Sequence, residues 1–243
     1  MAGIMLITGG SRGIGAATAR LAAERGYKLC INYVRGREAA EALARETDGI
    51  AVAADVSSES DVLRMFQEVD RRLGRLTVLV NNAGIVDLSQ RVDEMSAARL
   101  ARMFAINITG SFLCAREAVK RMSTRHGGKG GSIVNLSSVA AKVGAPGQYV
   151  DYAAAKGAID VFTLGLSKEV GGEGIRVNAV RPGVIKTEIH ASGGEPGRAE
   201  RIGATAPLGR AGEAEEIANA ILWLASDEAS YVSGAILDVS GGR

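Results

Sequence analysis

The sequence predicts an α/β fold, a doubly wound parallel sheet of seven strands with helices on both faces. Short apolar runs alternate with helical patterns along the 243 residues, which is typical of right-handed strand–helix–strand crossovers. The apolar runs are continuous, as expected for strands that are buried on both faces. Glycines recur at the predicted strand-to-helix turns. Because no linker or repeat interrupts this pattern, we expect residues 1–243 to form one domain.

The first predicted strand is "GIMLIT", a continuous apolar run that leads into a glycine turn. Six further runs of the same kind follow along the chain, and each is predicted to add one parallel strand. In chain order the seven predicted strands and their turns cover residues 3–8, 28–33, 50–55, 76–84, 131–138, 174–183 and 234–242.

The predicted helices lie between these strands. The first places Ile14 and Leu21 on one face through the i, i+7 spacing of a helix. The third has Ser57 or Ser58 as its N-cap, and the fourth is one long helical stretch that ends before the glycines at 127–128. The six predicted helices cover residues 13–25, 37–47, 59–74, 96–125, 149–170 and 213–225.

One long segment, 186–210, lacks a regular pattern. It carries four glycines and a proline between residues 193 and 203. A loop of this length in a compact domain usually forms a lid or binding loop. We therefore expect residues 186–210 to be a substrate loop.

The composition excludes several classes of partner. Lys and Arg number 29 against 27 Asp and Glu, and this net charge of +2 does not favour nucleic acid or an anionic membrane. No uninterrupted apolar run approaches the roughly 18 residues of a membrane span. The N-terminal sequence lacks the basic start and cleavage site of a secretory signal. We expect a cytoplasmic protein.

The sequence also offers no metal site and no hydrolase nucleophile. Cys30 and Cys114 both lie in apolar contexts, which predicts buried free thiols. His126 and His190 are far apart and lack ligand-like companions, and no G-x-S-x-G motif occurs. Hydrolysis by a metal or by an activated serine is therefore a poor fit.

A glycine-rich turn, "TGGSRGIG" at 8–15, joins the first predicted strand to the first predicted helix. Its glycines, Gly9, Gly13 and Gly15, let the backbone turn tightly and approach a pyrophosphate at the helix N-terminus. A plain tight turn is the alternative interpretation. The position between a buried strand and a helix favours a dinucleotide site.

The end of the second strand distinguishes NAD from NADP. A carboxylate at this position binds the 2′-hydroxyl of the ribose, whereas cationic groups accommodate a 2′-phosphate. Tyr33 occupies the expected acidic position, and Arg12, Arg35 and Arg37 are near in sequence. Arginine suits a phosphate, although these arginines could also be ordinary solvated surface residues. The sequence favours NADP over NAD.

Polar residues end the third and fourth predicted strands. Asp55 could accept a hydrogen bond from an adenine amino group, or it could cap the helix that follows. Asn81 and Asn82 could order the cofactor's ribose or tie neighbouring strands together.

A tyrosine and a lysine, Tyr152 and Lys156, lie one helical turn apart in "VDYAAAKGAID". A lysine cation at this spacing stabilises a phenolate and lowers the tyrosine pKa, so that the tyrosine can act as a general acid or base. Ser137 and Ser138 end the fifth strand, where a serine hydroxyl could hold a substrate oxygen. The pair alone is a common accident, and the glycine turn in the same sheet makes proton transfer the leading interpretation.

Taken in order, "TGGSRGIG", "NNAG", Asn107, "SS", "YAAAK", "VRPGVIKT" and "YVSGAILDVSGG" resemble the motifs of the short-chain dehydrogenase/reductase family. The resemblance covers the whole chain and implies a Rossmann-type sheet. The segments "DYAAAKGAID" and "HASGGEPGR" are similar to an enterobacterial oxidoreductase of that family.

The resemblance implies a role for each of four catalytic residues. Tyr152 is expected to be the general acid/base, and Lys156 to lower the pKa of Tyr152 and bind the nicotinamide ribose. Ser138, the second serine of its pair, is expected to position the substrate oxygen, although the gap to Tyr152 is one residue longer than in many members. Asn107 is expected to hold a water in a proton relay through Lys156.

The resemblance and the residue patterns together imply the cofactor contacts. We expect them to be Gly9, Ser11, Arg12, Gly13, Ile14, Gly15, Tyr33, Arg35, Asp55, Val56, Asn82, Ala83, Gly84, Tyr152, Lys156, Pro182, Gly183, Ile185 and Thr187.

The predicted function is an NADP-dependent oxidoreductase that interconverts a carbonyl and an alcohol. The substrate could be a 3-oxoacyl thioester or acyl-carrier substrate, or a sugar or polyol. The basic segment 120–131 could receive an acidic carrier protein or be a solvated helix end. The alternatives are a non-catalytic nicotinamide-binding regulator and an isomerase or dehydratase with a bound cofactor. The resemblance implies a homo-oligomer, a tetramer or a dimer.

Two further residues are weaker candidates for substrate contact. Tyr149 lies three residues before Tyr152, on roughly the same helix face, and could border the pocket or serve in packing. His190 lies in the predicted substrate loop and could touch the substrate, although a solvated loop histidine is the more common case.

Overall fold

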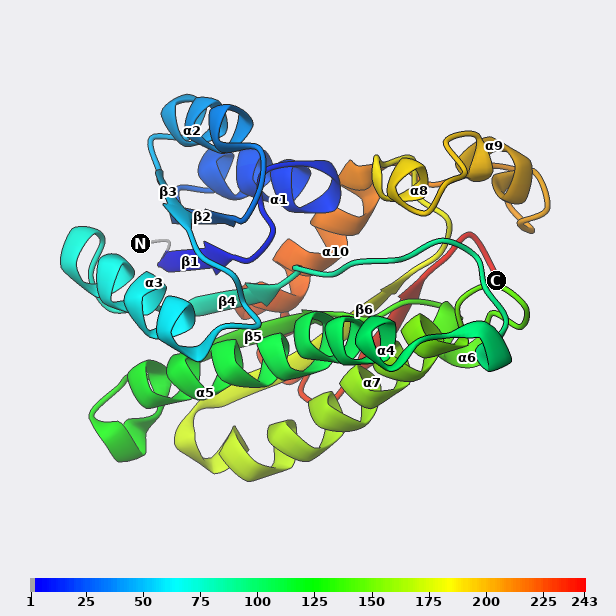
Figure 1. Ribbon diagram of the computed structural model, residues 1–243. Coiled ribbons are helices and arrows are strands. Elements are labelled where there is room, and N and C mark those ends of the chain that lie inside the picture. The colour runs from blue at the N-terminus through cyan, green and yellow to red at the C-terminus, as the bar shows by residue number, and fades with distance from the viewer. Residues whose placement is uncertain (1–2) are drawn as a thin grey trace.

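The computed structural model, which describes residues 3–243, contains a seven-stranded parallel sheet (Figure 1). Its strand order is β3-β2-β1-β4-β5-β6-β7. The predicted doubly wound sheet is confirmed. The strands are β1 (Ile4–Ile7), β2 (Lys28–Tyr33), β3 (Ile50–Ala53), β4 (Val78–Asn81), β5 (Gly131–Leu136), β6 (Ile175–Pro182) and β7 (Ile236–Val239).

Helices cover both faces of the sheet (Figure 1). One apolar core lies between the sheet and α1, α2 and α10, and a second lies between the sheet and α3, α5 and α7. The long helices are α1 (Gly13–Glu24), α2 (Arg37–Glu46), α3 (Glu59–Arg72), α4 (Ala97–Phe104), α5 (Gly110–Met122), α7 (Val150–Val170) and α10 (Ala214–Ala225). Short helices are α6 (Ala140–Val143), α8 (Ile189–Ser192) and α9 (Arg198–Gly203).

Strand β1 shows why the predicted strands are continuously apolar. Met5 and Ile7 belong to the first core, whereas Leu6 between them belongs to the second. Successive strand residues point to opposite faces, so both faces of a central strand must carry apolar side chains. Each of these three residues is fully buried.

The structure differs from the sequence prediction in two segments, one predicted as a single helix and one predicted as a loop. The stretch 96–125 is divided into α4 and α5 by a π-helical turn, Ala105–Thr109. Within that turn Asn107 donates a hydrogen bond from Nδ2 to the carbonyl of Met103 at 3.0 Å, which competes with regular helical bonding. The segment 186–210 contains α8 and α9 and is therefore not a structureless loop.

The topology brings the carboxyl ends of four central strands together. After β1 the chain continues to β2 on one side, while β4, β5 and β6 follow on the other side. Ligands of open α/β sheets bind at this point, where the strand order reverses. The predicted site residues follow these same strand ends. Within residues 3–243 no helix is both long and apolar enough to span a membrane.

Candidate active site

The glycine turn after β1 leaves the start of α1 open. Gly9 and Gly13 have positive φ angles of 59° and 52°, which favour glycine. At Gly15 a Cβ would lie 2.7 Å from both the Asn82 amide nitrogen and the Gly9 carbonyl oxygen, so a side chain there would clash. The N-cap residue Arg12 makes no side-chain cap, and no acidic residue lies in the first turn of α1. These features suit a diphosphate at the helix N-terminus.

Asparagines fasten the glycine turn to its neighbours. Asn82 donates from Nδ2 to the carbonyls of Thr8 and Gly9 at 2.8 and 2.9 Å. Asn32 accepts from the Gly9 N–H at 3.1 Å, and Asn81 donates to Asn135 Oδ1 at 3.0 Å. Of the two roles open for Asn81 and Asn82, both side chains therefore take the structural one, although Asn82 also lines the cavity described below.

Side-chain hydrogen bonds also fix the residues that follow β3. Asp55 accepts hydrogen bonds from the N–H and the hydroxyl of Ser57 at 2.9 and 2.6 Å, which shapes the turn before α3. The N-cap of α3 is Ser58. Val56 is buried in the second core, so its side chain serves packing, and the backbone is what it can offer a ligand.

Two exposed arginines, one in the glycine turn and one after β2, have no partner among the described side chains. Tyr33 is buried in the first core, so its ring does not replace an acidic side chain at the surface. Arg37 pairs with Glu41 at 2.6 Å. Arg12 and Arg35 are exposed, and neither has an ion pair or a side-chain hydrogen bond with any side chain or backbone group that the structure describes. Two unpaired guanidinium groups thus remain available to an anion.

A cavity of about 440 Å³ lies at the carboxyl ends of β4, β5 and β6. The predicted site residues that line it are Ile14, Asn82, Gly84, Ser138, Tyr152, Lys156, Pro182, Gly183, Ile185 and Thr187. A larger hollow of about 920 Å³ lies near the amino ends of the strands, beside Gly3 and Gly131, and none of its described lining residues is a predicted site residue.

Tyr152 and Ser138 meet at the wall of this cavity. Burial raises the pKa of Tyr152 to about 12, and the nearby hydroxyl of Ser138 lowers it to a smaller extent. The net shift of the Tyr152 pKa is therefore upward, whereas the sequence predicted a lowering. Desolvation of the phenolate outweighs the favourable contacts of the hydroxyl.

Lys156 lies beneath Tyr152 in α7. Its Nζ donates to the Leu136 carbonyl at 2.6 Å and lies 5.6 Å from the centre of the Tyr152 ring. Burial lowers the pKa of Lys156 to about 8, while the charge of Asp160 raises it. Lys156 is therefore mostly cationic at neutral pH and is directed at the backbone and the ring face.

The structure distinguishes the two serines. Ser137 is buried and donates from Oγ to the Lys156 carbonyl at 3.2 Å. Ser138 accepts from the Ala140 N–H at 3.1 Å at the start of α6 and reaches Tyr152. Ser138 is thus the serine that a substrate oxygen beside Tyr152 would meet. The short helix α6 takes up part of the long gap between Ser138 and Tyr152.

Asn107 is buried beside Gly84 and Lys156. A Cβ on Gly84 would lie 2.8 Å from Asn107 Oδ1 and 3.6 Å from Lys156 Nζ. Asn107 accepts from the Ile85 N–H and donates to the Ile85 carbonyl, both at 3.1 Å. Its side chain therefore holds the chain that leaves β4 against the π-helical turn.

The comparisons with known proteins agree with this geometry. A family model described as enoyl-(acyl carrier protein) reductase matches residues 9–243. An uncharacterised oxidoreductase, YgfF, of Escherichia coli (strain K12) is 54% identical over 245 residues, which is 99% of either chain. The chain belongs to the short-chain dehydrogenase/reductase family. The predicted family is confirmed, and the protein is an oxidoreductase acting between CH–OH and C=O groups.

Two more matches cover nearly the whole chain of this short-chain dehydrogenase/reductase. The 3-oxoacyl-[acyl-carrier-protein] reductase FabG of Staphylococcus aureus (strain Mu50) is 37% identical, over 98% of this chain and 96% of its own. A solved structure from Brucella melitensis 16M, described as a ribose-5-phosphate isomerase, has a TM-score of 0.91 and 33% identity, over 99% of this chain and 92% of its own.

The cysteines and the basic segment 120–131, which the sequence analysis also considered, lie outside the cavity of this short-chain dehydrogenase/reductase. Cys30 and Cys114 are buried free thiols, as predicted, and burial raises the pKa of each to about 12. In the basic segment Lys120 and Arg121 both pair with Glu117, and Arg125 pairs with Glu173. Most of this segment's charge is therefore already neutralised. Among the side chains that the structure describes, which exclude His190, no cluster of three His, Cys, Asp or Glu could hold a metal.

Two arginines that the sequence did not single out lie near Tyr152. Arg99 pairs with Asp151, the residue before Tyr152. Arg198 lines the cavity and lies over the Tyr149 ring at 5.1 Å, and Tyr149 in turn makes an edge contact with Tyr152 at 6.1 Å between ring centres. Both contacts join segments about 50 residues apart, which no local pattern reveals. The side chain of His190 lies outside the described part of the structure.

Proposed function

We propose that the protein is an NADP-dependent carbonyl reductase in which Tyr152 is the proton donor. The observation that carries this proposal is that Ser138, Tyr152 and Lys156 line one cavity, with Tyr152 and the buried Lys156 cation one turn apart on α7. Two neighbouring hydroxyl groups in one cavity can both form hydrogen bonds to a single substrate oxygen.

The proton chemistry follows from the positions of these side chains. Because the pKa of Tyr152 is about 12, its hydroxyl carries a proton at neutral pH and can donate it as negative charge develops on a carbonyl oxygen. Ser138 stabilises the same oxygen by a second hydrogen bond. Lys156 stabilises the phenolate that Tyr152 leaves behind. A bound nicotinamide dinucleotide would supply the hydride that adds to the carbonyl carbon.

The residues present fit such a cofactor. The uncapped start of α1 offers free N–H groups to the diphosphate, and the unpaired Arg12 and Arg35 suit a 2′-phosphate. Thr187 lies against the glycine turn, since a Cβ on Gly13 would be 3.2 Å from its Cγ2. These features support NADP over NAD and support the predicted contacts at Pro182, Gly183, Ile185 and Thr187.

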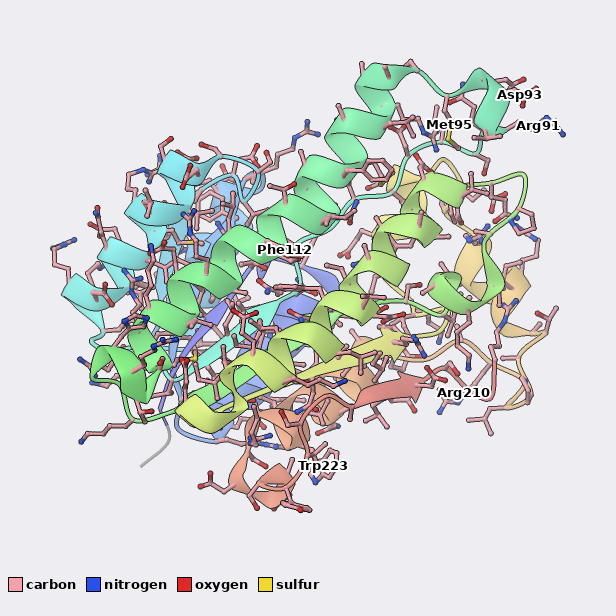
Figure 2. The ribbon with its side chains drawn as sticks, turned by 90° about the horizontal axis from the view of Figure 1, so that it is seen from below. Arg91, Asp93, Met95, Phe112, Arg210 and Trp223 are labelled. Carbon is pink, nitrogen blue, oxygen red and sulfur yellow. The ribbon has the colours of Figure 1, made fainter. Side chains whose placement is uncertain are left out.

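The proposal extends to the working form of the protein. The one continuous sheet supports a single domain. As a separate part of the proposal, we place the protein in the cytoplasm. Phe112 lies on α5 (Figure 2) and stacks against Phe162 on α7, with 3.7 Å between the ring centres. Phe112, Val161 and Leu164 form an exposed apolar α5/α7 face that supports assembly with a second copy of the chain, as a dimer or tetramer.

The function is tested by following NADPH and NADH consumption against a panel of ketones, 3-oxoacyl thioesters and keto sugars. The expected result is turnover of at least one carbonyl with NADPH, and a clear preference for NADPH over NADH. Turnover with NADH in preference to NADPH would overturn the cofactor assignment. A lack of turnover across the panel, with tight NADPH binding, would favour the non-catalytic regulator.

A second candidate is an isomerase that holds its cofactor permanently. The similarity to a structure described as a ribose-5-phosphate isomerase favours it. The purified protein separates the two cases, because a reductase must exchange its cofactor in each turnover. Stoichiometric retention of nucleotide through gel filtration, with isomerisation and no net consumption of NADPH, would support the isomerase.

A further inference from the structure

We propose that Arg198 recognises a carboxylate on the substrate, so that the preferred carbonyl compounds are oxo acids rather than neutral ketones. This inference rests on the proposed reductase function and adds a substrate class to it. Arg198 opens α9 in the segment that was predicted to be a loop, and it lines the same cavity as Tyr152 and Ser138.

Arg198 is held in place and still has free donors. Its side chain is only 15% exposed, and it donates to Gln148 Oε1 at 2.8 Å and to Glu195 Oε2 at 3.0 Å. The guanidinium also lies 5.1 Å from the centre of the Tyr149 ring. Arginine carries five N–H groups, and these two bonds leave three of them for a ligand. A planar, preorganised fork of this kind suits a carboxylate.

The charge balance around Arg198 favours an anion. The carboxylate of Glu195 pairs with two arginines, because its Oε2 accepts from Arg198 and also from Arg201, the latter at 2.8 Å. The described side chains of the cavity lining add the cation of Lys156, and Glu195 is the only acidic side chain among them. A substrate anion at this end of the cavity would therefore meet a net positive surrounding at low solvent exposure.

The position of Arg198 also bears on the spacing within the substrate. The Tyr149 ring contacts both groups, at 5.1 Å from the Arg198 guanidinium and 6.1 Å from the centre of the Tyr152 ring. One substrate could therefore place a carbonyl oxygen at the Tyr152 hydroxyl and a carboxylate at Arg198, and the test below varies the length of the chain between these two groups. The wall around them includes the apolar side chains of Val139, Val143 and Ile202, which suits a short aliphatic chain between the two groups.

The test compares acids with their methyl esters. The probes are 4-oxopentanoate, 5-oxohexanoate and 6-oxoheptanoate, each with its methyl ester, and the measured quantity is the ratio of kcat/KM for acid over ester. We expect the wild-type ratio to exceed one for at least one chain length and Arg198→Gln to lower it by about tenfold to hundredfold, because an unpaired anion replaces a paired one. Arg201→Gln is the matched control, since Arg201 shares Glu195 without lining the cavity, and it should keep the wild-type ratio.

A wild-type preference for the esters, or an Arg198→Gln ratio equal to that of the wild type, would overturn the inference. A binding measurement separates this result from a failure of the reductase function. In ligand-observed NMR, hexanoate should bind the wild type in preference to hexanamide, and Arg198→Gln should lose that preference. Equal binding of hexanoate to both proteins would overturn the role of Arg198 whatever the reaction.

Discussion

Arg99 and Asp151 form a bidentate ion pair that holds α4 against the first turn of α7. Arg99 donates from Nε and Nη2 to the two oxygens of Asp151 at 2.8 and 3.3 Å, and the side chains are 9% and 0% exposed. Asp151 also accepts from the Tyr152 N–H at 2.9 Å. Arg99 further donates to the Leu88 carbonyl at 2.7 Å. The pair thereby connects the loop after β4 to the helix that carries Tyr152.

We predict that Arg99→Met destabilises the fold by about 3–5 kcal/mol, because it leaves the Asp151 carboxylate buried without a cationic partner. Urea unfolding measures the change. Arg102→Met is the matched control, since its pair with Asp87 is largely exposed and should contribute less than about 1 kcal/mol. Equal destabilisation by both substitutions would contradict the buried character of the Arg99 pair.

We predict that carbonyl reduction becomes slower as the pH rises through about 8. Burial lowers the pKa of Lys156 to about 8, so its cation is present below that pH and is lost above it. The phenol of Tyr152 stays protonated over the same range, because its pKa is raised to about 12. The loss of rate thus reflects a phenolate that forms without a neighbouring cation. A profile of kcat against pH that stays flat through this range would refute the role of Lys156.

We predict that Arg12→Ala and Arg35→Ala each raise the KM for NADPH by about tenfold and change the KM for NADH much less. The reason is the loss of a charged hydrogen bond to the 2′-phosphate, which NADH does not carry. Initial rates at varied cofactor concentration give both constants. Arg37→Ala serves as the control, because Arg37 already pairs with Glu41, and it should resemble the wild type. Parallel losses with both cofactors would contradict the assignment.

We predict that Val161→Glu weakens self-association, since it places a charge on the exposed apolar α5/α7 face. Sedimentation velocity should show a smaller species than the wild type at the same concentration. Leu63→Glu on α3 is a control at an exposed apolar residue on another helix, and it should sediment as the wild type does. An unchanged sedimentation coefficient for Val161→Glu would exclude this face from the interface.

The features that the sequence predicts best are those with a local cause. In β1 the side chains alternate between two apolar cores, so the continuous apolar run follows directly from the position of the strand in the sheet. The glycine turn and the Tyr152–Lys156 pair have fixed short spacings, and the topology brings both to the carboxyl edge.

The features that the sequence does not predict depend on contacts between segments that are far apart in the chain. Arg99 and Asp151 are 52 residues apart, and Arg198 and Gln148 are 50 apart, so neither pair has a periodic signature. The glycines and proline of 186–210 suggested a loop, but α9 forms there with Ala199 buried. The direction of the Tyr152 pKa shift was also not predictable from spacing, because it depends on how much water reaches the hydroxyl.

The central claim is that Tyr152 donates the proton to the substrate oxygen. The most direct test is the single-turnover rate of NADPH oxidation by wild-type protein and by Tyr152→Phe, with the best carbonyl substrate and with NADPH binding measured separately. We predict a loss of about 10²–10⁴-fold in the rate, with the Kd for NADPH within a few-fold of the wild-type value. A Tyr152→Phe variant that oxidises NADPH at the wild-type rate would contradict the account.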